Sequence, residues 1–127
     1  MAKILVVDDS KFSRKRAVEA LHRAGHEVLQ AEDGEIGLAV IGTDPPDCVL
    51  LDMLMPVVDG YEFLSRLRGG GSSLPVVVVT ADIQTSTRER CEQLGVSGFL
   101  QKPARGEEVC RAVADALVIS GGGLPCN

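Results

Sequence analysis

Short apolar runs alternate along the chain with segments in which apolar residues recur at helical spacing. The first, third and fourth runs are almost continuously apolar, which is typical of strands buried on both faces of a parallel sheet. The pattern predicts five strands, at Lys3–Val7, Glu27–Ala31, Cys48–Asp52, Leu74–Val79 and Ser97–Gln101. Because a predicted helix follows each strand, we expect a parallel α/β sheet with right-handed crossovers and helices on both faces.

The first helix is predicted to begin at a cap formed by Asp9 or Ser10 and to end near Ala24, just before Gly25. Helical spacing is expected to turn four of its side chains inward, namely Phe12, Ala17, Val18 and Leu21. The other helices are predicted over Ile36–Ile41 after a turn at Asp33-Gly34, after a cap at Asp59, over Gln84–Leu94 and over Arg105–Val118.

Composition limits the class of protein. A length of 127 residues fits one domain, which we assign to residues 1–119, followed by a Gly-rich flexible tail at 120–127. Apolar residues make up 45% of the chain and aromatic residues only 3%, so the core must be aliphatic. The net charge of −5 argues against direct binding to nucleic acid or to an anionic membrane surface.

No apolar segment reaches the length of a membrane span, and the N-terminus begins a strand instead of a signal peptide, so a cytoplasmic location is expected. The cysteines are far apart and form no ligand motif, which predicts reduced thiols without a metal role: Cys48, Cys91, Cys110 and Cys126. His22 and His26 have no matching ligand set and are expected at the surface.

Polar groups stand at the ends of four predicted strands: Asp8 and Asp9, then Asp52, Thr80 and Lys102. In a parallel sheet these ends share one edge, where ligands and chemistry gather. Three carboxylates placed together repel one another unless a cation lies among them, and hard oxygen ligands favour Mg²⁺ or Mn²⁺. A cation, a hydroxyl and a lysine around Asp52 form a site for a phosphoryl group, with Asp52 placed for in-line attack.

The same residues resemble the motifs of the receiver domain of two-component response regulators. The resemblance covers Ala2 to Val118 and rests on motifs in the family's order and spacing: Asp8-Asp9, Leu50-Leu51-Asp52-Met53-Leu54-Met55-Pro56 with Asp59-Gly60, Thr80-Ala81 and Lys102-Pro103. It implies a flavodoxin-like, doubly wound fold with strand order 2-1-3-4-5. It also implies a cis peptide bond between Lys102 and Pro103.

By this resemblance, Asp52 is the phosphoacceptor that receives a phosphoryl group from a histidine kinase or a phosphotransfer protein. Asp9 and Asp52 are expected to ligate Mg²⁺ directly, Asp8 through water, and the backbone carbonyl of Leu54 directly. Lys102 is expected to contact one phosphoryl oxygen.

The resemblance also assigns residues to switching. Thr80 is expected to move towards the phosphoryl group while Phe99 turns inward, and Leu54 and Asp82 flank the site at positions that influence the lifetime of the phosphorylated state. As Phe99 has no hydroxyl, ordinary packing on an edge strand is the alternative interpretation of this residue.

The output surface implied by the family is the fourth helix, fifth strand and fifth helix, which would bind a downstream protein, with the domain a monomer or weak dimer. The fourth helix is unusually polar, and its expected apolar anchors are Ile83, Cys91 and Leu94. Weakly anchored elements are the ones that can move.

Other functions fit less well. The domain is expected to be a stand-alone signalling switch, with the receiver part of a longer regulator as the alternative, and not an enzyme with multiple turnovers. Phosphatases of the haloacid-dehalogenase type need a second aspartate two positions after the nucleophile, where this chain has Leu54. A flavin-binding module would need an uncharged phosphate loop where this chain has Asp8-Asp9.

Overall fold

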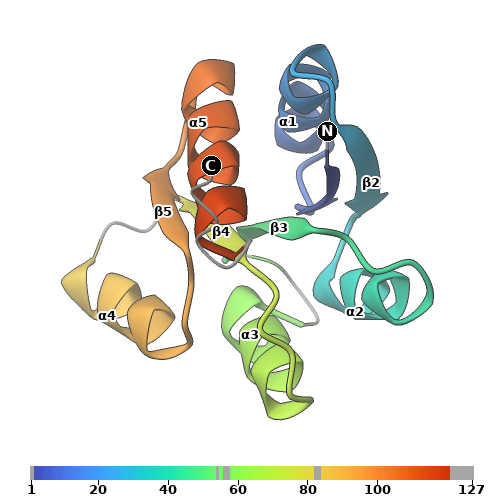
Figure 1. The fold of residues 1–127 in the computed structure, drawn as a ribbon. Helices are drawn as coiled ribbons and strands as arrows, with labels where there is room; N and C mark the ends of the chain where they lie inside the picture. The colour runs from blue at the N-terminus through green and yellow to red at the C-terminus, as the bar shows by residue number, and fades with distance from the viewer. Residues whose placement is uncertain (1, 54, 56–57, 82–83, 121–127) are drawn as a thin grey trace.

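The computed structural model describes residues 2–53, 55, 58–81 and 84–120 of the chain. It contains a parallel sheet of five strands in the order 2-1-3-4-5: β1 (Lys3–Val7), β2 (Glu27–Ala31), β3 (Cys48–Asp52), β4 (Val76–Thr80) and β5 (Gly98–Gln101). The connecting helices are α1 (Lys11–Arg23), α2 (Gly34–Thr43), α3 (Gly60–Gly69), α4 (Thr85–Gln93) and α5 (Gly106–Ser120). Figure 1 shows α1 and α5 on one face of the sheet and α2, α3 and α4 on the other. The predicted doubly wound fold and its strand order are confirmed.

Each face of the sheet has its own core. The cluster under α1 and α5 contains Val18 and Leu21 of α1, and the cluster on the opposite face contains Phe63 and Leu64 of α3. Every residue of the central strand β3 is buried, because the strand is covered on both faces. The cores are mostly aliphatic, as the composition predicts.

Side-chain caps fix the starts of three helices. Ser10 Oγ accepts from the Ser13 N–H at 3.2 Å, and the Asp59 carboxylate accepts from the Glu62 N–H at 2.9 Å, as expected for caps. Asp33 accepts from the Ile36 N–H at 2.8 Å. The second helix therefore begins at Gly34, two residues before its predicted start, because Asp33 caps a helix and does not merely form a turn.

The inward position predicted for Phe12 is wrong. Its side chain is 72% exposed, and the Arg16 guanidinium lies 5.7 Å from the centre of its ring. The inner face of α1 is set by Val18 and Leu21. Phe12 precedes Leu21 by nine residues, or about two and a half helical turns, and so lies on the opposite side of the helix.

The described thiols are free, as predicted: Cys48 and Cys91 are buried and Cys110 is half-buried, whereas Cys126 lies outside the described residues. His22 is exposed, whereas His26 is half-buried and its Nδ1 accepts a 3.1 Å hydrogen bond from the Ala2 N–H. Within the described ranges, none of the helices combines the length and apolar character needed to cross a membrane.

Candidate functional site

The carboxyl edge of the sheet brings together three carboxylates. Asp52 ends β3, and Asp8 and Asp9 directly follow the neighbouring strand β1. One carboxylate oxygen from each residue lies within 4.8 Å of the other two. Asp52 and Asp8 are only 5% and 7% exposed, whereas Asp9 is exposed. The structure thus places at one point the acidic residues that the sequence singled out.

A lysine from the far strand joins this cluster. Lys102 follows β5, and its Nζ donates to Asp52 Oδ2 at 3.0 Å and to Asp8 Oδ2 at 3.1 Å. Burial lowers the pKa of Lys102, but the hydrogen bonds and negative charges of Asp52 and Asp8 outweigh this effect and leave the pKa raised above 10.5. The side chain is therefore a fixed positive charge against the carboxylates.

The backbone around the lysine is held by its neighbours. The Lys102 N–H donates to the carbonyl of Thr80 at 2.8 Å, and the predicted cis peptide bond to Pro103 is present. Thr80 is fully buried at the end of β4, which pairs with the end of β3 through Asp52 and Val79. Strand pairing therefore puts Thr80 at the same edge as Asp52 and Lys102.

Asp8 is held from several sides. Its N–H donates to the Ala31 carbonyl at 3.1 Å, and its Oδ1 accepts from the Ser10 N–H at 2.9 Å. Because Lys102 binds its Oδ2, both carboxylate oxygens of Asp8 have protein partners. The Arg14 guanidinium donates to the Asp8 carbonyl at 2.7 Å. This arginine was not predicted, since the pattern alone does not distinguish it from the other basic residues of α1.

Two glycines hold the segment that follows Asp52. A Cβ on Gly60 would lie 2.7 Å from Met53 Cα, and a Cβ on Gly34 would lie 2.7 Å from the Val58 carbonyl oxygen. The Gly60 N–H also donates to the Met53 carbonyl at 3.2 Å. Only residues without a side chain allow these approaches, so both glycines help to place the chain on either side of residue 54.

Of the three remaining residues with a predicted role, only Phe99 lies within the described part of the chain. Phe99, on the edge strand β5, is half-buried against the core on the α3 side, and the Arg88 guanidinium lies 5.5 Å from its ring centre. Leu54 and Asp82 lie outside the described residues. Their predicted ligand and lifetime roles therefore stay predictions.

The donor set fits a small divalent cation. Three carboxylates and one ammonium group leave a net negative charge in a largely buried site, and the oxygen ligands are the type that Mg²⁺ prefers. A hollow of about 200 Å³ between α1 and α5 adjoins the cluster and is lined by Asp8, Asp52 and Lys102, with Ser13 and Arg16 among its α1 residues.

An acidic cluster with a lysine, at the carboxyl edge of a sheet in the order 2-1-3-4-5, defines a flavodoxin-like protein with a candidate phosphotransfer site. Residues 4–114 match the model of the response regulator receiver domain, and the chain belongs to this family. It is a receiver domain of two-component response regulators.

The relatives have two kinds of architecture. Protein PilH of Pseudomonas aeruginosa is 33% identical over 92% of this chain and 98% of its own length. Response regulator MprA of Mycobacterium tuberculosis is 39% identical over 84% of this chain, which spans only 46% of MprA.

Solved structures divide in the same way. Chemotaxis protein CheY4 of Vibrio cholerae has a TM-score of 0.86 and 30% identity, covering 91% of this chain and 98% of its own. NtrX of Brucella abortus has a TM-score of 0.89 and 29% identity, covering 96% of this chain but only 28% of its own. The receiver fold thus occurs in these relatives both as nearly the whole protein and as one part of a longer one.

Proposed function

We propose that the domain accepts a phosphoryl group on Asp52 and signals with it. The observation that carries the proposal is the Asp52 carboxylate, buried at the sheet edge, bonded by Lys102 and grouped with Asp8 and Asp9. In the reaction, an Asp52 oxygen forms a bond to phosphorus while the bond from phosphorus to the donor's histidine nitrogen breaks, and the imidazole leaves with the bonding electron pair.

The surrounding residues act on charge and position. Asp9 and Asp52 would hold Mg²⁺ directly and Asp8 through water, as the resemblance implies, with the Leu54 carbonyl as a further ligand. When bound, the ion would partly neutralise the negative charge on the phosphoryl oxygens. Lys102 neutralises another of these oxygens, and because its two hydrogen bonds already fix its ammonium group, little reorganisation is needed when negative charge arrives.

Incubation with acetyl phosphate and Mg²⁺, followed by intact mass spectrometry, tests the proposal. We expect one phosphoryl group per chain, none when EDTA is present from the start, and none in Asp52→Asn. The exposed Asp115→Asn on α5 is the matched control and should be modified like the wild type. An adduct that persists in Asp52→Asn would place the acceptor elsewhere.

The protein that donates the phosphoryl group is proposed to be a histidine kinase or a histidine phosphotransfer protein that contacts α1. Phe12 is exposed on this helix beside the basic residues Lys11, Lys15 and Arg16, although the chain as a whole is acidic. An apolar contact surrounded by cations suits a partner with an acidic surface. Phe12→Ala should slow transfer from a phosphorylated phosphotransfer protein while leaving modification by acetyl phosphate unchanged.

The signal is proposed to leave through α4, β5 and α5. Thr80 and Phe99 would couple the phosphoryl group to a two-state equilibrium of this surface, which binds a downstream protein. Amide-resolved NMR spectra with and without beryllofluoride test this step. In the wild type, we expect beryllofluoride to shift the amide signals of residues 84–94. In Asp52→Asn, we expect the spectra with and without beryllofluoride to be the same. Unshifted signals of residues 84–94 in the wild type would contradict the proposed output route.

The domain is further proposed to work in the cytoplasm, as a monomer or weak dimer, and to hold its phosphoryl group instead of turning over substrate. The free thiols agree with a reducing compartment. PilH and CheY4 favour a stand-alone switch, and MprA and NtrX favour the receiver part of a longer regulator. The length of the chain encoded by the native gene discriminates between these two architectures.

A further inference from the structure

Arg14 connects three elements next to the acidic cluster. It stands in the first turns of α1, and its Nη1 donates to the carbonyl oxygen of Asp8 at 2.7 Å. Its Nε donates to the Oε1 of Gln30 on β2 at 3.3 Å. One half-buried guanidinium therefore ties α1 to the end of β1 and to the edge strand.

The carbonyl that Arg14 binds belongs to the peptide group between Asp8 and Asp9. On the Asp8 side of this peptide, the backbone and side chain are already fixed by Ala31, Ser10 and Lys102. The Asp9 side differs, because within the described part of the chain no hydrogen bond or ion pair engages the exposed Asp9 carboxylate. The direction of that carboxylate consequently depends on the backbone that carries it.

We propose that Arg14 is a positioning residue for the cation site. By holding the Asp8–Asp9 peptide plane, it keeps the Asp9 carboxylate directed at the point shared with Asp8 and Asp52. The inference rests on the proposed function, in which this cluster binds Mg²⁺. It assigns a role in metal binding to a residue that touches neither the metal ligand atoms nor the phosphoryl group.

Two effects of Arg14 on Mg²⁺ affinity have opposite signs. As a nearby positive charge, the guanidinium repels a divalent cation, so its removal would strengthen binding. As a positioning group, it lowers the cost of orienting Asp9, so its removal would weaken binding. The direction of the change in affinity therefore decides which effect dominates, independently of its exact size.

The test is a Mg²⁺ titration of the full chain by isothermal calorimetry, repeated with Mn²⁺ by electron paramagnetic resonance. We expect Arg14→Met to weaken binding about tenfold, the effect typical of groups that orient metal ligands. Arg14→Lys keeps the positive charge and a donor that can bind the Asp8 carbonyl, so its Mg²⁺ affinity should lie between those of Arg14→Met and the wild type. Lys15→Met is the matched control, because this exposed lysine of the same helix does not line the hollow beside the acidic cluster, and we expect its Mg²⁺ affinity to lie within about twofold of the wild type.

A second measurement separates positioning from a general loss of structure. The initial rate of modification by acetyl phosphate should fall in Arg14→Met at low Mg²⁺ and approach the wild-type rate at saturating Mg²⁺. A merely structural role would lower the rate at every Mg²⁺ concentration. Amide NMR spectra of each variant verify the fold, and Arg14→Lys provides the test if Arg14→Met does not fold.

The outcomes are distinct. Unchanged or tighter Mg²⁺ binding in Arg14→Met, with a wild type that binds, overturns this inference and leaves the proposed function standing. An equal loss in Lys15→Met also overturns it, since net charge would then explain the effect. A wild-type protein that binds no Mg²⁺ overturns the proposed function, and this inference with it.

Discussion

At the residue scale, Lys102 controls the electrostatics of the cluster. Its ammonium group is the partner recorded for a side-chain oxygen of both Asp52 and Asp8, two carboxylates that are almost fully buried. A buried carboxylate that loses a charged partner costs free energy, because less of its desolvation is then compensated. The lysine that is proposed to serve phosphotransfer thus also stabilises the fold.

Lys102→Met should therefore lower the free energy of unfolding in EDTA by about 1–3 kcal/mol. Added Mg²⁺ should recover much of the loss, because a bound cation replaces the missing positive charge. Urea unfolding with EDTA and with excess Mg²⁺ measures both effects. A Lys102→Met variant as stable as the wild type in EDTA would show that the carboxylates do not depend on this lysine.

The stability that Lys102 contributes also depends on pH. Since the folded-state pKa of Lys102 is raised above 10.5, its contribution is complete below pH 10.5 and is lost as the pH rises through the folded-state pKa.

Cys48 gives a second pH dependence. Its thiol is fully buried at the start of β3, and burial raises its pKa from 9.0 to about 12. Between these values the unfolded chain loses this proton and the folded chain keeps it, so stability is full below pH 9 and falls above it. From pH 8 to pH 10 the wild type should lose about 1.3 kcal/mol more than Cys48→Ala, measured by urea unfolding at each pH. Equal slopes would contradict the burial argument.

The residues of the site differ in how far the sequence could predict them. Asp8, Asp9, Asp52, Thr80 and Lys102 were predictable as a group, because parallel strands bring their carboxyl ends to one edge. Arg14 was not predictable, since its role depends on a long side chain that reaches from α1 to the end of β1 and to β2. Phe12 was misplaced because helical spacing fits more than one face when a helix carries few apolar residues.

At the element scale, α4 has few buried residues, and two of its arginines add contacts with aromatic rings of neighbouring elements. Only Thr87 and Cys91 are buried on this helix. The predicted anchor Cys91 is confirmed, Leu94 is half-buried against the same core, and Ile83 lies outside the described residues. Arg90 stacks 3.7 Å from the ring centre of Tyr61, in addition to the Arg88 contact with Phe99. Cation–π contacts of this kind bind the helix to α3 and β5 without filling a core, which suits an element proposed to move.

The C-terminal end of α4 is clamped by Arg68 of α3. Its guanidinium donates to the carbonyls of Leu94 and Gly95, both at 2.9 Å, and to those of Ser72 and Leu74. Burial lowers the pKa of this arginine, but its hydrogen bonds satisfy the charged group. These bonds fix the C-terminal end of α4 to α3, and a movement of the helix is expected to turn about this end.

Arg68→Met should release that end. We expect faster amide hydrogen exchange over residues 85–96 and a loss of about 1–3 kcal/mol in the free energy of unfolding, because four carbonyls lose a charged donor. Arg66→Met is the matched control, since that neighbouring arginine makes ion pairs with Glu35 and Glu62 at the surface, where such pairs contribute little. Mass-spectrometric hydrogen exchange measures the comparison, and equal protection of 85–96 in the two variants would refute the clamp.

The close approach of Gly60 to Met53 leads to a further prediction at the scale of an element. Gly60→Ala would put a Cβ 2.7 Å from Met53 Cα, so the residue next to Asp52 must shift. Overpacking of this kind costs about 1–3 kcal/mol. Gly42→Ala is the control: a Cβ at this position on α2 meets nothing within 4 Å, and alanine in a helix should stabilise by up to about 1 kcal/mol. Thermal unfolding compares the two, and changes of equal sign would contradict the steric argument.

At the scale of the whole molecule, the fold was more predictable than its boundaries. The alternation of strands and helices, with right-handed crossovers, leaves few arrangements for five strands. The ends of elements depend on individual hydrogen bonds, as the Asp33 cap of α2 illustrates.

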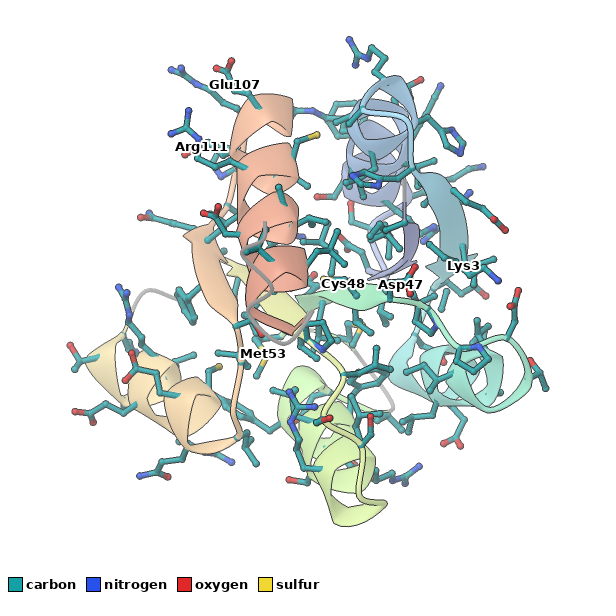
Figure 2. All side chains as sticks on the ribbon, in the orientation of Figure 1. Lys3, Asp47, Cys48, Met53, Glu107 and Arg111 are labelled. Carbon is teal, nitrogen blue, oxygen red and sulfur yellow. The ribbon has the colours of Figure 1, made fainter. Side chains whose placement is uncertain are left out.

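Contacts between distant segments were also not predictable from the local pattern. Figure 2 shows Lys3 and Asp47 close together, and the Lys3 N–H donates to the Asp47 carboxylate at 2.8 Å. The division into a domain at 1–119 and a tail stays a prediction, because residues 121–127 lie outside the described ranges.

The same figure shows Glu107 and Arg111 of α5 directed away from α1, in the part of the molecule proposed for output. They belong to a shallow surface hollow lined also by Arg105, Glu108 and Asp115. Charges of both signs alternate here, whereas the neighbouring helix α1 is mainly basic. The domain thus presents two chemically different helix faces, which suits one partner for phosphotransfer and another for output.

The acidic site itself is expected to limit the stability of the whole molecule. Three carboxylates share one edge of the sheet with a single lysine bonded to two of them, so the metal-free fold contains uncompensated negative charge. Asp9→Asn removes one such charge, from the carboxylate that has no recorded ion pair among the described residues. The free energy of unfolding of this variant in EDTA should exceed that of the wild type by about 0.5–1 kcal/mol. The variant should gain less stability from Mg²⁺, because a ligand that binds only the folded state stabilises it more the more tightly it binds. Urea unfolding at a series of Mg²⁺ concentrations measures both quantities, with Asp115→Asn as a control for net charge. If Asp9→Asn is no more stable than this control in EDTA, or responds to Mg²⁺ as strongly as the wild type, the site does not trade stability for metal binding.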